Sequence, residues 1–406
     1  MTVQDIGIKS KTAVIIGAGR IGRGFLAEIF HKSEYDIVFI DIDRELVDML
    51  NSADKYTIFK TSREKTDTYT VSGFRALHTS QFGEVCDVLS REDAIAAVAV
   101  PLESLPDVAE NTFPIAIARR AMECVSIPLD VLVCVNAMSP AGRLRALLDS
   151  LLGGAALDYM RGNMGFVDTI VMSMSPDISP QVKAIDPLGV QNNGYPIMRV
   201  DSAAFKGPIP ESDMISPCSN MYAEEKRKIY TVNMSHAVLA YVGSAKGHIY
   251  AVEAIYDPAV KQVVLGALEE SSYGLCSGFG FTPDEMKTWC EEVLDMLDNP
   301  LLEDSLARLG ADTARKLSVG DRLVGPALLC LRAGKMPVNL IKAIAHGYLF
   351  TISDDPGTEK TQDIVRRYGI VMALEILSGL DIKHPIQNAV LEAYYSAKDK
   401  MDEAVI

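Results

Sequence analysis

The stretch Ala13-Val-Ile-Ile-Gly17-Ala-Gly19-Arg-Ile-Gly22 decides the fold of the first half of this chain. Its apolar start, in which three of four residues are β-branched, indicates a buried strand over 13–16. The helical spacing of apolar residues from Ile21 to Lys32 indicates a helix directly after the glycines. A G-x-G-x-x-G pattern alone is weak evidence. Between a strand and a helix, and with Asp41 at the end of the next strand (37–40), it has the context of a dinucleotide-binding turn.

The residues of this pattern each have a chemical reason to be there. Gly17 permits the tight turn, Gly19 lets the backbone approach a pyrophosphate, and Gly22 lets the helix pack closely on the strand. The helix amino terminus, which carries Arg20 and Ile21, presents free N–H groups and a positive dipole end to the pyrophosphate. We therefore expect these five residues to contact a dinucleotide cofactor.

Asp41 is the residue that selects the cofactor. Its carboxylate is placed to accept hydrogen bonds from the adenosine ribose diol and would repel a 2′-phosphate, which favours NAD over NADP. The nearby Arg44 keeps NADP open as an alternative. Another alternative is a glycine-rich turn that binds a different ligand, or none.

Alternating strands and helices predict a doubly wound domain for the first part of the chain. Further buried strands are expected at 94–100 and 131–135, and extended inserted structure at 56–80. The segment 176–222 holds seven of the 19 prolines and is interpreted as a connector.

Helical patterns without a convincing strand begin near Ala223. We predict an α/β fold: an N-terminal Rossmann-type, doubly wound NAD-binding domain over 1–200, and an all-helical C-terminal substrate and catalytic domain over 201–406. The expected helical segments are 223–243, 258–276, 283–297, 301–315, 320–333, 336–347, 358–378 and 385–402.

Composition excludes several classes of protein. The 406 residues are 48% hydrophobic and 23% charged, which rules out wholesale disorder. The net charge is 39 − 54 = −15. So acidic a chain repels phosphate backbones and anionic lipid, and we expect neither nucleic acid nor membrane as a partner. Small anionic substrates remain open, because a local basic pocket can override the global field.

Cysteine usage and hydropathy indicate a cytoplasmic protein. The seven cysteines are odd in number and form no C-x-x-C pair, which argues against a disulfide framework and a structural zinc site. We expect small buried hydrophobes in a reducing compartment, and no metal. No run approaches the ~20 apolar residues that a bilayer span needs.

Lys228, Asn233 and His236 are the candidate catalytic residues. At ~100° per residue of an uninterrupted helix they lie at roughly 0°, 140° and 80°, so they share one face. A desolvated Lys228 could act as the base in hydride transfer from an alcohol, Asn233 could donate to the oxyanion, and His236 could orient hydroxyls. From spacing alone, solvated surface charge for the lysine and local hydrogen bonding for Asn233 and His236 are the more usual roles of such residues.

The chain resembles the polyol-specific long-chain dehydrogenases, the mannitol dehydrogenase family, over nearly its whole length. The signature Lys-x4-Asn-x2-His carries the resemblance. It extends to Gly17-Ala-Gly-Arg-Ile-Gly-Arg-Gly-Phe25, Val71-Ser-Gly73, Gly165-Phe-Val-Asp168, Phe205-Lys-Gly207, Asn233-x-x-His-Ala237, Leu268-Glu-Glu-Ser271, Arg315-Lys-Leu-Ser-x-Gly-Asp-Arg-Leu323 and Ser378-Gly-Leu380.

The resemblance assigns roles to named residues. It implies that Lys228 is the general base, that Asn233 and His236 are the signature pair, and that Asn136, after a late Rossmann strand, is a second oxyanion-holding asparagine. The acidic residue that precedes this asparagine in the family is Val135 here, so Asn136 departs from the pattern in its surroundings.

The resemblance also implies a substrate. The chain length fits the sugar-phosphate branch of the family, which implies reversible oxidation of mannitol 1-phosphate to fructose 6-phosphate with NAD. Another polyol or a hexuronate, such as mannitol, fructuronate or tagaturonate, is the alternative within the family. A non-catalytic NAD-binding regulator is the alternative outside enzymes.

A phosphorylated substrate requires cations or backbone N–H groups. The candidates are Lys206, Arg315, Lys316 and Arg322. Arg315 and Arg322 would share a helix face unless Gly320 breaks the helix between them. Surface or interdomain salt bridges are the alternative role for all four residues.

Overall fold

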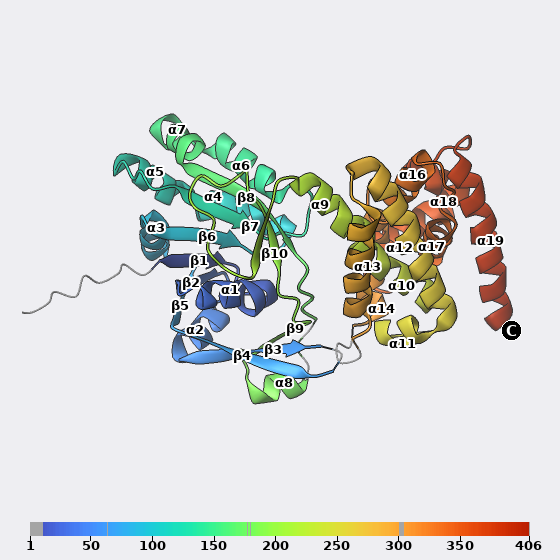
Figure 1. The fold of residues 1–406 in the computed structure, drawn as a ribbon, viewed down its shortest axis with the longest axis horizontal. Coiled ribbons are helices and arrows are strands. Elements are labelled where there is room, and N and C mark those ends of the chain that lie inside the picture. Colours follow the sequence, from blue (N-terminus) through green and yellow to red (C-terminus); the bar gives the residue numbers. More distant parts are fainter. Residues whose placement is uncertain (1–10, 63, 177, 179, 300–303, 406) are drawn as a thin grey trace, which may run out of the picture. The chain divides into compact units, whose positions relative to one another are not determined.

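The computed structural model describes residues 11–405 apart from 63, 177, 179 and 300–303 (Figure 1). The chain divides into two compact units, Met1–Tyr222 and Ala223–Ile406. The first is a Rossmann-type α/β unit and the second is helical, so the predicted fold class is confirmed.

An eight-stranded sheet forms the centre of the first unit, in the order β11-β10-β8-β7-β6-β1-β2-β5. All neighbours pair in parallel except β10, which runs antiparallel to β8. The strands are β1 (Thr12–Ile16), β2 (Asp36–Asp41), β5 (Phe74–His78), β6 (Ala94–Val98), β7 (Leu129–Val133), β8 (Met164–Val171), β10 (Met198–Asp201) and β11 (Ile215–Cys218).

Both faces of this sheet are buried, which explains the continuous apolar runs of its strands. Val14 and Ile16 of β1 pack in one hydrophobic cluster with the helices α3–α7, while Ala13 and Ile15 pack in a second cluster with η1 and α1 (Figure 1). The helical elements are η1 (Gly22–Leu26, a π turn), α1 (Ala27–Lys32), α2 (Arg44–Ser52), α3 (Phe82–Ser90), η2 (Leu102–Ser104), α4 (Leu105–Asn111), α5 (Pro114–Met122), α6 (Pro140–Leu151), α7 (Gly154–Asn163) and α8 (Pro180–Ile185).

A small second sheet has the order β4-β3-β9, built from β3 (Lys55–Thr61), β4 (Thr66–Ser72) and β9 (Val190–Asn192). It contains most of the extended structure predicted for 56–80, although β5 at the end of that stretch joins the main sheet. The interpretation of 176–222 as a connector is wrong, because this segment supplies β9, β10 and β11. The unit boundary lies at Tyr222/Ala223, whereas the boundary that we predicted, 200/201, falls inside β10.

The described residues of the second unit contain helices and no strand. Its central helix α10 is buried over Ala237–Gly243 and contacts α11, α12, α14 and α17. The elements are α9 (Met221–Lys228, which starts two residues before the unit), η3 (Ile229–Asn233, a π turn), α10 (Met234–Ser244), α11 (Ala251–Tyr256), α12 (Pro258–Phe279), α13 (Pro283–Leu297), α14 (Leu306–Gly310), α15 (Thr313–Lys316), α16 (Val324–Arg332), α17 (Val338–Leu349), α18 (Pro356–Ser378) and α19 (Pro385–Val405).

Two helices differ from the prediction. The segment 223–243 is not one regular helix, because η3 interrupts it. Arg315 and Arg322 do not share a helix either: α15 ends at Lys316, Gly320 takes a positive φ of 85°, and α16 begins at Val324. In the predicted helix 301–315, residues 301–303 lie outside the described residues.

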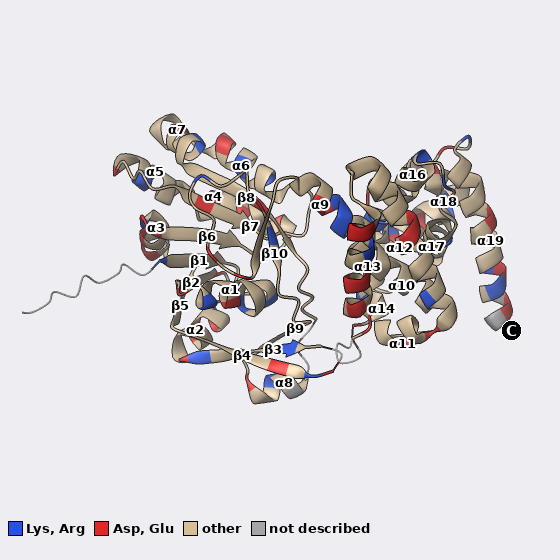
Figure 2. Cartoon of the chain, viewed as in Figure 1, with Lys and Arg blue, Asp and Glu red and all other residues tan. Residues whose placement is uncertain are grey.

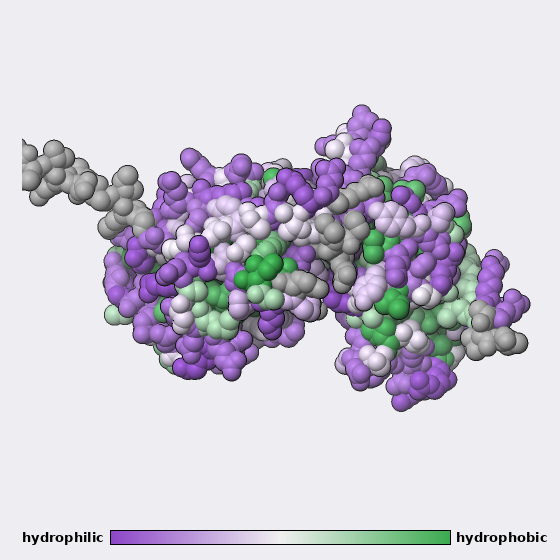
Figure 3. Space-filling view, turned by 90° about the horizontal axis from the view of Figure 1, so that it is seen from below, coloured by the Kyte–Doolittle hydropathy of each residue, from purple (hydrophilic) through white to green (hydrophobic). Residues whose placement is uncertain are grey.

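None of the helices in the described part of the chain combines the length and apolar character of a bilayer span. On the face drawn in Figure 3, hydrophobic residues form small patches among hydrophilic ones. Two of the seven cysteines, Cys86 and Cys330, are buried as expected, whereas Cys124 is exposed and the others are intermediate.

Candidate active site

The glycine-rich turn at the carboxyl end of β1 is shaped by close backbone contacts. Gly17 has a φ of +95°, and a Cβ there would lie 2.4 Å from the carbonyl oxygen of Ala99. A Cβ on Gly22 would lie 2.0 Å from the carbonyl oxygen of Gly17. A Cβ on Gly19, by contrast, would meet nothing within 4 Å. The chain itself therefore requires two of the three glycines, and the third leaves space for a ligand.

Asp41 lies beside this turn at the carboxyl end of β2. Its Oδ2 accepts a hydrogen bond from the backbone N–H of Ala18 at 2.6 Å, and its Oδ1 accepts one from the N–H of Asp43 at 2.9 Å. Both oxygens are thereby oriented, and each keeps acceptor capacity for a further donor.

Arg23 stabilises the turn through hydrogen bonds to backbone carbonyl groups, a role that we did not predict from the sequence. Its buried guanidinium donates from Nε to the carbonyl oxygen of Ala18 and from Nη1 to that of Leu188, each at 2.6 Å. The Tyr56 hydroxyl donates to the Arg23 carbonyl at 2.7 Å. The small sheet and the segment before β9 are thus tied to the turn. The only sequence signal was an arginine directly after Gly22.

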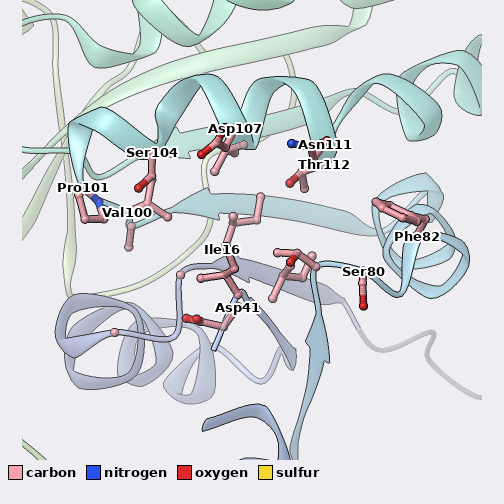
Figure 4. A pocket seen from close by; sticks show the side chains of 17 residues that line it. Ile16, Asp41, Ser80, Phe82, Val100, Pro101, Ser104, Asp107, Asn111 and Thr112 are labelled. Atoms are coloured by element: carbon pink, nitrogen blue, oxygen red, sulfur yellow. The ribbon is translucent and has the colours of Figure 1, made fainter. Parts of the chain in front are cut away.

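A cavity of about 390 Å³ opens over the turn (Figure 4). Gly17, Gly19 and Asp41 line it on one side, while Arg20 and Ile21 do not line it. Figure 4 shows Ser104, Asp107 and Asn111 on the opposite wall, above Ile16 and Asp41. No sequence motif indicated that wall, to which η2 and α4 contribute Ser104, Asp107, Val108 and Asn111, together with Thr112.

Arg44 lies at the rim of this cavity. Its guanidinium is 3.4 Å from the hydroxyl of Ser80, which lines the cavity, and 3.5 Å from Nδ1 of His78. The side chain is exposed. Arg44 is therefore close enough to the cavity to keep NADP as a cofactor alternative.

Asn136 is exposed on the loop that follows the carboxyl end of β7. Asp168 on β8 fixes this loop, because it accepts hydrogen bonds from the N–H of Ala141 at 2.8 Å and from the Ser139 hydroxyl at 3.4 Å. The loop thus belongs to the same edge of the sheet as Gly17 and Asp41, where ligands bind in doubly wound folds.

Lys206 lies at the other edge of the sheet. The backbone N–H groups of Lys206 and Gly207 donate to the Asp130 carboxylate at 2.8 and 2.9 Å, at the amino end of β7. Burial raises the pKa of Asp130, although these N–H groups act in the opposite direction. The Phe205-Lys-Gly207 motif is therefore explained by its backbone, and we leave Lys206 out of the phosphate site.

The predicted trio lies around the π turn of the helical unit. Lys228 ends α9, Asn233 ends η3, and His236 is the third residue of α10. Burial lowers the pKa of His236 to about 3, and the positive charges of Arg308, Arg322, Lys316 and Lys228 act in the same direction. The imidazole is consequently neutral at neutral pH.

These influences on His236 identify a group of cations around it, which we call the cation cluster: Lys228, Arg308, Lys316 and Arg322. Lys316 is 5% exposed, and its Nζ donates to the carbonyl oxygen of Leu309 at 2.6 Å. Arg322 is 7% exposed and pairs with Asp321 at 2.9 Å. Two of the four predicted phosphate candidates, Lys316 and Arg322, are thus buried cations whose charges act on His236.

Two further arginines, Arg308 and Arg315, have exposed side chains, unlike Lys316 and Arg322. Arg308 was not predicted; its side chain is 45% exposed and pairs with Asp304. Arg315 was predicted, but its side chain is 49% exposed and pairs with Asp312 and Asp321, although its charge contributes to lowering the pKa of Lys316. Arg315 fits the alternative role of a surface salt bridge.

No group of three or more His, Cys, Asp or Glu side chains in the described ranges could hold a metal ion.

Comparisons with known proteins cover almost the whole chain. Residues 11–213 match a family model described as the mannitol dehydrogenase Rossmann domain, and residues 220–405 match one described as the mannitol dehydrogenase C-terminal domain.

Two solved structures are similar to this chain. The first is the Pseudomonas fluorescens mannitol 2-dehydrogenase in a ternary complex with NAD and D-mannitol, with 16% identity over 98% of this chain and 94% of that chain, and a TM-score of 0.77. The second is a D-sorbitol dehydrogenase in substrate-free form, with 14% identity over 97% and 94%, and a TM-score of 0.79. At these identities the likeness establishes the fold.

Proposed function

Because the chain belongs to the mannitol dehydrogenase family, a family of oxidoreductases, we propose that it interconverts mannitol 1-phosphate and fructose 6-phosphate with NAD. The observation that carries the choice of substrate is the cation cluster around His236. A small neutral polyol has no need of Arg308, Lys316 and Arg322 in one place, whereas a phosphate group is recognised by such cations.

Support for NAD comes from the first unit. Gly19 leaves room for a pyrophosphate, the helix amino terminus after it presents N–H groups, and Asp41 is oriented beside the cavity. The similarity to a mannitol 2-dehydrogenase whose structure was solved in complex with NAD agrees with this choice. Bound NAD supplies the hydride acceptor in the oxidation direction.

The chain's own residues then have separate tasks. Lys228, in its neutral form, takes the proton of the reacting hydroxyl, and in the reduction direction its ammonium form returns that proton. Asn233 and Asn136 donate hydrogen bonds to the developing alkoxide. The neutral imidazole of His236 orients the hydroxyls of the substrate, and it does not add to the positive charge of the cluster.

The cation cluster suits a dianion for an energetic reason. Lys316 and Arg322 are both more than nine-tenths buried, so each loses hydration and each raises the electrostatic cost of the other. Asp321 offsets part of this cost for Arg322. A phosphate with two negative charges would offset more of it and would be held by charge-assisted hydrogen bonds.

A second candidate is the same chemistry on an unphosphorylated substrate. The similar solved structures are named for mannitol and sorbitol, and the carboxylate of a hexuronate would also suit a cationic pocket. These candidates share Lys228, Asn233 and His236 and differ only at the cation cluster.

The deciding experiment follows the oxidation of NADH and of NADPH by absorbance, with fructose 6-phosphate, fructose, fructuronate and tagaturonate offered separately. We expect strong turnover only with NADH and fructose 6-phosphate. In Arg322→Ala the KM for fructose 6-phosphate should rise by roughly ten- to a hundredfold, the effect of losing about 1.5–3 kcal/mol of a charged hydrogen bond, with a smaller change for fructose.

Two controls separate the alternatives. Arg332→Ala removes an exposed arginine of the same unit whose Nε donates to a carbonyl of its own helix, and it should leave both KM values unchanged. Lys228→Ala should abolish turnover while NADH binding persists, which a non-catalytic NAD-binding regulator would not explain. Turnover with fructose or a hexuronate instead would discard the phosphate site and keep the trio.

A further inference from the structure

The helix that carries the catalytic trio contains a π turn between Lys228 and His236. In η3 the backbone N–H of Met234 donates to the carbonyl of Ile229, five residues back instead of four. A π turn inside an α-helix accommodates one residue more than an α turn. Compared with an uninterrupted helix, the residues after η3 are therefore rotated about the helix axis relative to the residues before η3.

This rotation changes how the trio is aligned. In an uninterrupted helix Asn233 and His236 lie roughly 140° and 80° from Lys228. With one residue absorbed by the π turn, Asn233 counts as four residues from Lys228 and His236 as seven, which gives roughly 40° and −20°. The angular spread of the three side chains falls from about 140° to about 60°. The charge of Lys228 acting on His236 agrees with this alignment.

Two buried hydroxyl groups are bonded to the backbone of this turn. Thr231 Oγ1 donates to the carbonyl of Arg227 at 2.6 Å, and Ser271 Oγ, from α12, donates to the carbonyl of Tyr230 at 2.5 Å. Both residues are fully buried. These hydroxyl groups donate to carbonyl oxygens in place of the backbone N–H groups that would bond them in a regular α-helix. Side-chain groups inserted into the helical hydrogen-bond ladder are a known cause of local departures from α-helical geometry.

Trp289 connects the turn to α13. Its indole Nε1 donates to Thr231 Oγ1 at 2.7 Å, so the hydroxyl of Thr231 both accepts and donates and has a fixed direction. The face of the same indole lies 4.1 Å from the guanidinium of Arg227, which also pairs with Glu224 and stacks on Phe281 at 4.7 Å. Arg227 directly precedes Lys228, so these contacts fix the last turn before the candidate base.

We propose that Thr231, Ser271 and Trp289 are positioning residues that hold the π turn in place and thereby align Lys228, Asn233 and His236. They touch neither substrate nor cofactor and act through the backbone of residues 227–233. The proposal deepens the proposed function and rests on it, because alignment matters only if the trio performs the chemistry.

The test compares Thr231→Val, which keeps the shape and removes the hydroxyl, with Thr231→Ser, which keeps the hydroxyl. In Thr231→Val we expect kcat for fructose 6-phosphate reduction to fall about 10- to 100-fold, the effect of misplacing reacting groups by about an ångström. The pH midpoint of mannitol 1-phosphate oxidation should shift, because the surroundings of Lys228 change. NADH affinity should stay at the wild-type value, and Thr231→Ser should restore kcat and the midpoint.

Thr361→Val is the matched control. Thr361 is a buried threonine of α18 whose Oγ1 also donates to the carbonyl four residues back, of Gly357, and accepts a hydrogen bond from another side chain, Thr313. Its loss costs a comparable amount of stability without touching η3. A fall of kcat in Thr361→Val as large as in Thr231→Val would overturn the proposal, as would unchanged kcat and pH midpoint in Thr231→Val.

Backbone hydrogen exchange keeps this inference separate from the proposed function. Peptides that cover 229–236 should exchange faster in Thr231→Val than in wild type or Thr361→Val, with or without a substrate. If the wild type turns over none of the substrates, the proposed function fails, and the exchange data alone then decide the inference. Unchanged exchange over 229–236 in Thr231→Val would overturn it.

Discussion

Lys316 is the residue whose surroundings depart most from what its type prefers. It is 5% exposed, and the pKa of its ammonium is lowered to about 7 by burial and by the charges of Arg322 and Arg315. In the unfolded chain a lysine has an ordinary pKa near 10.5. Between about pH 7 and pH 10.5 the unfolded chain therefore binds more protons at this position than the folded chain, and the free energy of unfolding rises with pH across this window.

Replacing Lys316 by Met should remove this pH dependence. The part of the free energy of unfolding that depends on a neutral Lys316 is fully present above the pKa of the unfolded chain, 10.5. It is lost as the pH falls through the pKa of the folded chain, about 7. We expect the stability advantage of Lys316→Met over wild type to be largest near pH 7 and to shrink toward pH 10, by at most about 1.4 kcal/mol per pH unit. Urea unfolding of the full chain at several pH values measures it, with Lys342→Met, on the exposed side of α17, as the control. An advantage that stays constant with pH would contradict the burial argument.

Individual residues also show where sequence reasoning stops. Lys228 and His236 were predicted as one face of a helix, and the structure places them near each other. Arg308 was not predicted because it belongs to no motif. It lies on α14, more than seventy positions after His236 in the chain. Trp289 belongs to no motif in the sequence, and its hydrogen bond to Thr231 and its contact with Arg227 give it a specific position beside the π turn.

At the scale of elements, the turn between β1 and η1 is determined by its own backbone. The predicted roles of the three glycines separate cleanly in the structure: Gly17 and Gly22 have no space for a side chain, while Gly19 has open space. The first two are needed to form the turn, and the third is needed only when a ligand approaches.

This difference predicts contrasting effects of two alanine substitutions. Gly19→Ala should unfold near the wild-type midpoint and yet bind NADH at least tenfold more weakly, because its methyl group points into the space of the pyrophosphate. Gly22→Ala should lower the free energy of unfolding by about 1–3 kcal/mol, the usual cost of overpacking, and lose NADH binding as well. Thermal unfolding and NADH fluorescence titration test both. Equal loss of stability in the two variants would refute the assignment.

Helices and strands were predicted well where the hydrophobic period was strong and poorly where a contact overrides it. The strands β1, β2, β6 and β7 of the main sheet follow continuous apolar runs, which need no partner to be recognised. The π turn of η3 cannot be seen in the period, whereas Gly320 marked in the sequence the point where the helix between Arg315 and Arg322 breaks. The short strands β10 and β11 were hidden in a proline-rich segment.

At the scale of the whole molecule, the positively charged cation cluster contrasts with the negative net charge of the protein. The 54 acidic and 39 basic residues give a net charge of −15, and Figure 2 shows both kinds spread over the two units. The cation cluster is a local exception inside the helical unit. Because interactions with the distant surface charges are screened beyond about 10 Å at ordinary salt, the nearby cations dominate for a bound anion.

Salt should therefore weaken the binding of a phosphorylated substrate more than that of a neutral one. Raising ionic strength from about 0.05 to about 0.5 M should increase the KM for fructose 6-phosphate severalfold and change that for fructose little. In Arg322→Ala the salt effect should be smaller than in the wild type. Steady-state kinetics at several salt concentrations measure both. A KM for fructose 6-phosphate that is independent of salt would show that charge does not select the substrate.

The sequence by itself determined the fold class and the glycine-rich turn, and it indicated Lys228, Asn233 and His236 as catalytic candidates, which stay a prediction. These depend on local rules, namely the period of apolar residues, the sterics of glycine and the order of side chains along one helix. Only the tertiary structure decided which cations act on His236, that Arg315 is exposed and paired with Asp312 and Asp321, and that a π turn lies between Lys228 and His236. These depend on residues distant in the chain, such as Arg308 and Ser271, whose contacts exist only after the helices have packed.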